Sequence, residues 1–173
     1  IKIYSIADMV KLSLLFLVLL VTTTYAQIGS DGTGTVNGYY VGPGADLSFA
    51  YLSGANLTNA TLGNADLSFA YLGNANLNFA DLSGIDLSSA NLTGVISGNI
   101  TGTPTLPFAY LMINGYIVGP NANLTGANLT GADLSGADLT GADLTGVISG
   151  NITGAPTLPE GYQMVNGYIV GPN

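Results

Sequence analysis

Three aspartates recur at one spacing, and their side chains are the strongest candidates for chemistry in this chain. Asp46, Asp66 and Asp86 are evenly spaced, and each is followed directly by Leu. Carboxylates about 5 Å apart suit a retaining glycosidase, and carboxylate oxygens are ligands that Ca²⁺ prefers. A flat row of acids offers no cleft to exclude water from a sugar, so we predict that the chain is not an enzyme.

The same three aspartates form a weak candidate for a calcium site. Like charges at this spacing repel, which predicts raised carboxylate pKa values and relief by a bound divalent cation. The competing interpretation is that the carboxylates are simply solvated on an outer face. We predict no catalytic residues, no cofactor-binding residues and no cofactor other than this calcium candidate, Asp46, Asp66 and Asp86.

Composition excludes most other chemistry. The chain contains no Cys and no His, and its only basic residues are Lys2 and Lys11. Ser/His/Asp, Ser/Lys and Cys/His arrangements therefore cannot be built after residue 26. Nine of the ten acids lie in that part, so it carries a formal charge of about −9 at neutral pH. Such a surface repels nucleic acid and anionic lipid and attracts divalent cations or a basic protein face.

Aromatic residues repeat with the same spacing as the aspartates. Phe49 and Phe69 form one pair, and Tyr51 and Tyr71 form another. We expect them to form an aromatic strip along one edge, and such strips bind sugar or protein. The competing interpretation is stacking between neighbouring strands that stabilises the fold.

These side chains belong to a sequence repeat of five residues, and the structure of that repeat must position them. Ten pentads fill residues 45–94 and five more fill residues 122–146, with Leu at the third position of all fifteen. One pentad of an α-helix would turn by about 500°, so the Leu residues would spiral around a helix and form no stripe. In a strand, the Ala and Leu of A-x-L point to one side and the middle residue to the other. Each pentad is therefore predicted to be one short strand followed by a turn.

The distance along the chain from Asp46 to Asp66 is four pentads, which indicates that four pentads close one coil. Asp46 then lies over Asp66, at the ordinary strand separation of about 4.8 Å. Inside the coils, Leu47, Leu67 and Leu87 form one of several stacked columns. We expect successive coils to satisfy one another's backbone hydrogen bonds.

These A-[DN]-L-x-x repeats resemble those of the pentapeptide-repeat family, and the resemblance covers all fifteen pentads. It implies an all-β fold, a right-handed quadrilateral parallel β-helix. Some proteins of this family resemble duplex DNA in shape and charge and bind a DNA topoisomerase.

A second repeat separates the pentad blocks. Residues 94–121 recur at 146–173 with 23 of 28 positions identical, and a partial copy occupies residues 36–44. Each copy contains Asn-Gly between apolar residues, which predicts a β-hairpin with a type I′ turn. The predicted order is a linker and hairpin (27–44), a first block (45–94), a connector and hairpin (95–121), a second block (122–146), and a connector and terminal hairpin (147–173). Either the last hairpin is a terminal cap, or the chain is a fragment of a longer array in which another pentad block follows this hairpin.

Residues 1–26 are predicted to be an upstream leader and a signal peptide, Met9–Ala26. Lys11 precedes a short apolar run, residues 12–21, and Thr24 and Ala26 suit a cleavage site. A transmembrane anchor is the competing interpretation, but spanning needs about 20 apolar residues. We expect a secreted, extracellular or periplasmic protein without a stable membrane anchor after cleavage.

Two functions fit the sequence. The first is an exported, non-enzymatic solenoid that serves as a structural or protein-interaction module, with an unknown protein or carbohydrate partner and no nucleic acid. The alternative is an acidic DNA mimic that binds a topoisomerase and protects gyrase, although gyrase is cytosolic. End-to-end self-association is left open.

Overall fold

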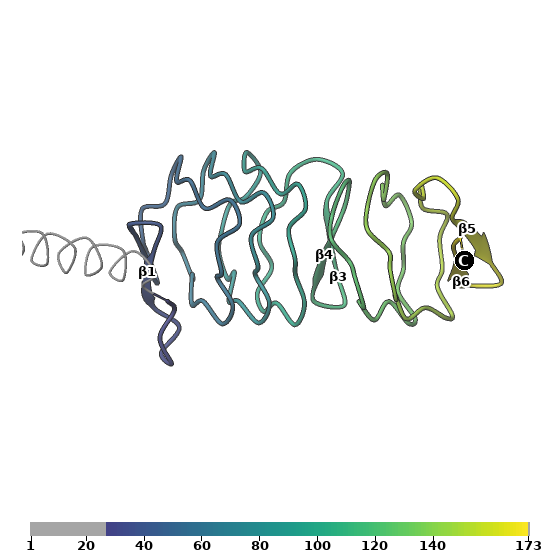
Figure 1. The fold of residues 1–173 in the computed structure, drawn as a ribbon, viewed down its shortest axis with the longest axis horizontal. Coiled ribbons are helices and arrows are strands. Elements are labelled where there is room, and N and C mark those ends of the chain that lie inside the picture. Colours follow the sequence, from purple (N-terminus) through teal and green to yellow (C-terminus); the bar gives the residue numbers. More distant parts are fainter. Residues whose placement is uncertain (1–26, 173) are drawn as a thin grey trace, which may run out of the picture.

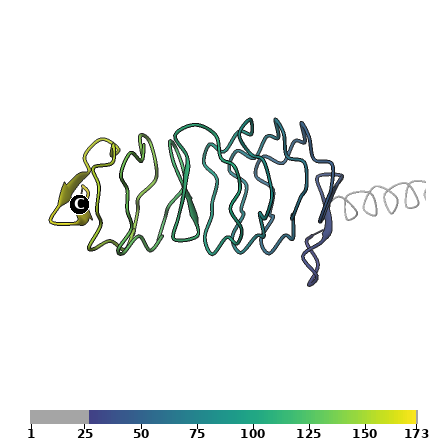
Figure 2. The ribbon, with the colours of Figure 1, turned by 180° about the vertical axis from the view of Figure 1, so that it is seen from behind.

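The computed structural model describes residues 27–172, which form one elongated stack of coils (Figure 1 and, from behind, Figure 2). Three antiparallel hairpins lie along the stack, one at each end and one between the two pentad blocks. Their strands are β1 (Gly34–Val36), β2 (Tyr39–Val41), β3 (Leu111–Ile113), β4 (Tyr116–Val118), β5 (Gln163–Val165) and β6 (Tyr168–Val170). The described residues contain no helix long and apolar enough to cross a membrane. The predicted leader and signal peptide lie outside the described residues.

Parallel pairing between pentads of successive coils builds the stack. Asp46 pairs with Asp66 and Tyr51 pairs with Tyr71, each in parallel. The backbone N–H of Leu47 donates to the carbonyl of Asp66 at 2.8 Å, and the N–H of Asp66 donates to the carbonyl of Ala45 at 2.8 Å. The pattern repeats from pentad to pentad, so the predicted four-sided parallel β-helix is confirmed.

The interior is filled by the Ala and Leu of the pentads. Leu67 is 1% exposed, whereas its neighbour Ser68 lies on the outer surface and is only half-buried. Corner residues adopt the left-handed conformation, as at Gly54 (φ 68°) and Asn59 (φ 62°). Gly and Asn tolerate this region better than other residues, which explains why the pentads end in them so often.

Residues 95–105 continue the solenoid, although the sequence predicts a connector there. Ile96 pairs in parallel with both Asn76 and Asn123, and Thr101 pairs with Asp81. Val95 and Ile100 are buried in the positions that Ala occupies elsewhere. The period of five is obscured in the sequence here, because the buried third position holds Ser97 rather than Leu. Residues 147–157 repeat the arrangement.

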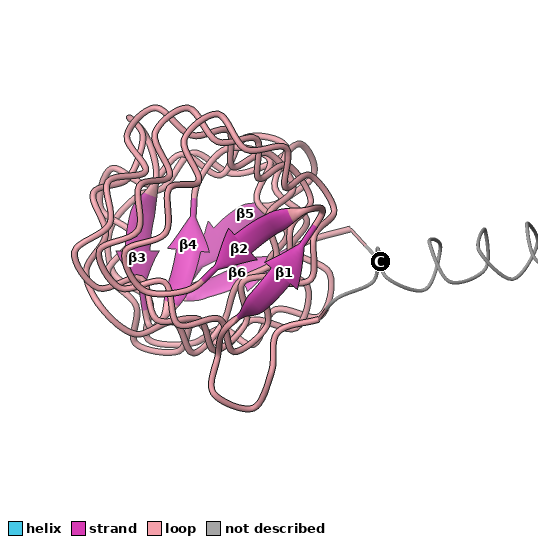
Figure 3. Ribbon diagram, turned by 90° about the vertical axis from the view of Figure 1, so that its left-hand side faces the viewer, coloured by secondary structure: helices cyan, strands magenta, loops and turns pink. Residues whose placement is uncertain are grey.

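Each hairpin lies across the interior of the coil, as the view along the stack shows (Figure 3). The predicted Asn-Gly turns are present, with positive φ at Asn37 (51°) and Gly38 (83°) in the first hairpin. The middle hairpin β3–β4 has two apolar faces. Met112 and Ile117 pack on the core of the first block, while Val118 belongs to the core of the second. The hairpin therefore divides the core into two clusters.

Candidate interaction surface

Each aspartate of the pentads is held by a hydroxyl residue two positions later. The backbone N–H of Ser48 donates to Asp46 Oδ1 at 3.1 Å, and its Oγ–H donates to the same oxygen at 2.6 Å. Asp-x-Ser/Thr favours this local turn because a short carboxylate reaches the backbone two residues on. The backbone bond recurs in the pairs Asp66–Ser68, Asp81–Ser83, Asp86–Ser88, Asp133–Ser135, Asp138–Thr140 and Asp143–Thr145.

These hydrogen bonds determine the direction in which the carboxylate pKa values shift. The bonds from Ser48 lower the pKa of Asp46 below its usual value, and the neighbouring charge of Asp66 raises it by a smaller amount. The pKa of Asp66 and that of Asp86 are lowered for the same reason. The expectation that crowding raises the pKa values along this row is therefore wrong, because hydrogen bonds to the charged form outweigh screened repulsion between exposed groups.

The structure places the three aspartates of the calcium candidate on one face of successive coils. Asp46 and Asp66 pair directly across coils, and the charge of Asp66 acts on Asp86. Within residues 27–172, no group of three acidic side chains lies close enough to hold a metal ion. Weak calcium binding by this row stays a prediction that rests on its charge alone.

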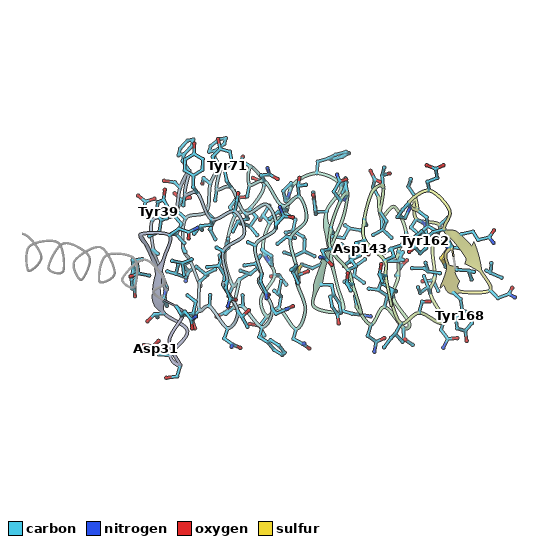
Figure 4. All side chains as sticks on the ribbon, viewed as in Figure 1. Asp31, Tyr39, Tyr71, Asp143, Tyr162 and Tyr168 are labelled. Carbon is cyan, nitrogen blue, oxygen red and sulfur yellow. The ribbon has the colours of Figure 1, made fainter. Side chains whose placement is uncertain are left out.

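Two aromatic columns flank one corner of the solenoid, and we call Phe49, Phe69, Tyr51 and Tyr71 the aromatic corner. The rings of Phe49 and Phe69 stack with centroids 5.0 Å apart, and those of Tyr51 and Tyr71 with centroids 4.7 Å apart. Figure 4 shows Tyr71 projecting from the outer edge of the coils. Stacking leaves much of the rings in solvent, since Tyr51 is 66% exposed and Phe49 is 60% exposed. The predicted strip is present, and its rings stack across coils as the competing interpretation expected.

Three phenylalanines occupy corners in a strained backbone conformation. Phe49 and Phe69 have φ of 57° and Phe79 has φ of 61°. The left-handed region costs a residue with a bulky side chain roughly 1–2 kcal/mol. The signal was visible in the sequence as Phe in the fifth position of a pentad, where Gly and Asn are common, but its cost is seen only once the backbone angle is known. Backbone strain of this kind clusters at functional sites in proteins, which makes these corners candidates for a binding surface.

A comparison with protein families matches this chain to the family model described as "Pentapeptide repeats". Eight copies of the repeat match, within residues 44–78, 70–96 and 120–148. The matched ranges include the residues of the aromatic corner and the three aspartates of the calcium candidate. A search of curated protein sequences found no match.

Solved structures of similar proteins also carry this repeat. A pentapeptide repeat protein from the Arabidopsis thaliana thylakoid lumen is 28% identical, with 61% of this chain and 58% of that chain covered and a TM-score of 0.31. One from the cyanobacterium Cyanothece 51142 is 32% identical, with coverages of 60% and 60% and a TM-score of 0.29. HetL of Nostoc, which is involved in heterocyst differentiation regulation, is 28% identical, with coverages of 63% and 57% and a TM-score of 0.24. The match thus spans less than two thirds of each of these chains.

Proposed function

We propose that this chain, whose repeats match the family model "Pentapeptide repeats", is an exported, non-enzymatic solenoid that acts as a protein-interaction module through its aromatic corner. One observation carries the proposal. Phe49 and Phe69 hold left-handed backbone angles and remain more than half exposed, at 60% and 52%. Gly at the same corner position would remove the strain, so the rings are best explained by a partner that covers them.

Charge favours a basic partner. Asp46 and Asp66 lie on the coil face beside the corner, and their lowered pKa values keep them ionised at neutral pH. The sequence after residue 26 contains no Lys or Arg that would compete for them. Lys and Arg side chains bind carboxylates and also pack on aromatic rings. We therefore propose an extended basic segment of another protein as the partner.

Export rests on the sequence that precedes Gln27. Lys11, the short apolar run and the small residues that follow it are typical of a cleaved signal peptide. Secretion of the chain with a new N-terminus at Gln27, read by mass spectrometry, would support this part of the proposal.

The corner is tested with a fluorescent peptide of alternating Lys and Ser as the probe. We expect saturable binding to the full chain that weakens at least tenfold in the double variant Tyr51→Ala, Tyr71→Ala. Tyr40→Ala is the matched control, because Tyr40 is an exposed aromatic residue on the first hairpin. Equal binding by both variants would refute the corner as the site. Loss of thermal stability in the double variant without any peptide binding by the original chain would leave the rings a purely structural role.

A further inference from the structure

One further aromatic side chain lies fully in solvent near the middle of the stack. Phe108 is 99% exposed, and it belongs to the turn that leads into the hairpin β3–β4. Both faces of its ring are free, whereas Phe49 and Phe69 each cover one face of the other by stacking. Contacts within the described part of the chain therefore contribute almost nothing to keeping a phenylalanine here.

The second copy of the hairpin repeat shows that the fold does not require this residue. The two copies differ at five of their 28 positions, and Phe108-Ala109 in the first corresponds to Glu160-Gly161 in the second. Both turns use the left-handed region, with φ of 71° at Ala109 and 83° at Gly161. Gly adopts such angles without the strain that Ala carries. The first copy thus forms a more strained turn and places an apolar ring where the second copy places a charge.

The base of this turn is fixed by hydrogen bonds. The backbone N–H of Tyr110 donates to the carbonyl of Pro107 at 3.0 Å, and its Oη–H donates to the carbonyl of Pro120 at 2.7 Å. The Tyr110 ring lies so close to Gly119 that no Cβ would fit there. Phe108 is therefore presented on a backbone that a binding partner does not have to order.

The turn that carries Phe108 lies at the same corner of the solenoid as the aromatic corner. Thr105 pairs in parallel with Asp86, so it continues the aspartate row into the next coil. The turn over residues 107–110 then closes by a backbone hydrogen bond of 3.0 Å, as does the turn over residues 47–50. A later coil therefore repeats the corner of the aromatic columns, and Phe108 lies on it.

One small residue separates Phe108 from the stacked rings. Ser89 occupies this corner in the coil between Phe69 and Phe108. Two strand separations of about 4.8 Å place the corner backbones of Phe69 and Phe108 roughly 10 Å apart. An extended segment covers this distance with about three residues. A single segment that lies along the stack can thus contact the stacked rings and Phe108 together.

Carboxylates lie on both sides of Phe108 along the stack. Asp86 belongs to the preceding coil. Asp138 belongs to the following coil, and it lies near the base of the turn, since burial and then the charge of Asp138 raise the pKa of Tyr110. Hydrogen bonds from the hydroxyl residue two positions later lower the pKa of each of these aspartates, so both are ionised at neutral pH. A cation placed on Phe108 therefore has a carboxylate on either side.

We propose that Phe108 binds an arginine side chain of the basic segment, with the guanidinium stacked on the ring and paired with Asp86 or Asp138. This inference rests on the proposed function, which supplies the basic segment, and it specifies the cation that the segment carries. Arg fits better than Lys because its planar guanidinium stacks on an aromatic face and presents a fork of N–H donors to a carboxylate. The sequence after residue 26 contains no Lys or Arg, so the arginine belongs to another molecule.

The test compares two fluorescent peptides of equal length on the full chain, one alternating Arg with Ser and the other alternating Lys with Ser. We expect the Arg peptide to bind roughly fivefold more tightly, and we expect Phe108→Ser to bring the two peptides to about equal affinity. Phe79→Ser is the matched control, because Phe79 is an exposed phenylalanine at a different corner, and it should keep the preference for Arg. Thermal melting should show the same stability for Phe108→Ser as for the original chain, because the side chain is 99% exposed.

The outcomes distinguish the arginine site from the aromatic corner. Equal binding of both peptides that is lost in Tyr51→Ala, Tyr71→Ala but unchanged in Phe108→Ser would overturn the arginine site and leave the aromatic corner in place. A preference for Arg that depends on Phe108 but not on Tyr51 or Tyr71 would support the arginine site and exclude the aromatic corner. An equal loss of the preference in Phe79→Ser would overturn the arginine site, and absence of binding by either peptide at millimolar concentration would overturn both.

Discussion

At the scale of single residues, the pentads tie each carboxylate to the turn that follows it. Asp46 accepts two hydrogen bonds from Ser48, and the pattern recurs on both blocks. The repeat spacing predicted the row of acids correctly but not their pKa direction. That direction depends on where the Ser hydroxyl points, which the Asp-x-Ser spacing alone does not reveal.

Removing one of these hydroxyl groups should change the pKa of the carboxylate that it contacts. In Ser48→Ala, we expect the pKa of Asp46 to rise toward its usual value, measured by NMR titration of the carboxyl carbon. Ser53→Ala is the control, because Ser53 contacts the carbonyl of Tyr71 and no carboxylate. Because the folded pKa is lowered, the stability that the bond contributes is present above the unfolded pKa and is lost as pH falls through the folded pKa. An unchanged pKa in Ser48→Ala would show that the bond does not form.

The strained corners give a second prediction at this scale. Phe79 has φ of 61° and is 56% exposed, so Phe79→Asn should stabilise the chain by up to about 1 kcal/mol through relief of the left-handed strain. Phe69→Asn relieves the same strain but loses the stacking with Phe49, worth about 0.5–1.5 kcal/mol. Urea unfolding of the two variants compares them directly. A lower midpoint for Phe79→Asn than for Phe69→Asn would contradict this account.

At the scale of elements, regular pentads were predictable and irregular ones were not. A-x-L with Leu at the third position of every pentad gives an alternation that only a strand satisfies. Residues 95–105 form the same kind of short strand with Val, Ile and Ser in the buried positions. Because Leu is absent from these positions, the sequence pattern does not predict the strands. The hairpins were predictable from Asn-Gly alone, but their place inside the coil depends on packing that no local motif encodes.

The buried columns can be tested with neighbouring residues. Leu67→Ala should cost about 2–5 kcal/mol of unfolding free energy, because the side chain is 1% exposed and leaves a cavity between Leu47 and Leu87. Ser68→Ala removes one exposed hydrogen bond and should cost about 1 kcal/mol or less. Denaturant unfolding measures both, and similar losses in the two variants would refute the assigned alternation.

At the scale of the whole molecule, the middle hairpin separates two cores that share no buried residue. The two blocks are joined because Ile117 belongs to one core and the adjacent Val118 to the other. We infer that each block with its hairpin is a complete packing unit, as in other solenoids whose stability is a sum over neighbours.

A deletion tests this inference. Removing residues 95–146 joins Gly94 to Val147, which recreates the Gly-Val sequence of both repeats. Met164 and Ile169 then replace Met112 and Ile117, so the shortened chain should fold with a single cooperative transition and a β-rich circular dichroism spectrum. A shorter deletion of residues 95–121 removes a hairpin while keeping the second block, and we expect it to fold less stably. An unfolded product from the longer deletion would refute the modular packing.

The acidic surface of the whole solenoid also provides a test that distinguishes the interaction module from the DNA mimic. A DNA mimic should inhibit gyrase supercoiling, and neutralising Asp46 and Asp66 should relieve the inhibition. We expect no inhibition at micromolar concentration of the chain that begins at Gln27, because the second pentad block is short and the hairpins divide the stack. Clear inhibition that is lost in Asp46→Asn, Asp66→Asn would favour the DNA mimic.

The two-faced middle hairpin has a consequence for how genes of this kind change. Since the repeats at residues 94–121 and 146–173 are nearly identical in sequence, recombination between their coding segments gains or loses one whole unit. Such an exchange keeps the reading frame. In every resulting protein, the new junction between units contains a hairpin with the same apolar face. Natural variants of this gene should therefore differ in length by steps of one unit, and alleles with partial units should be rare.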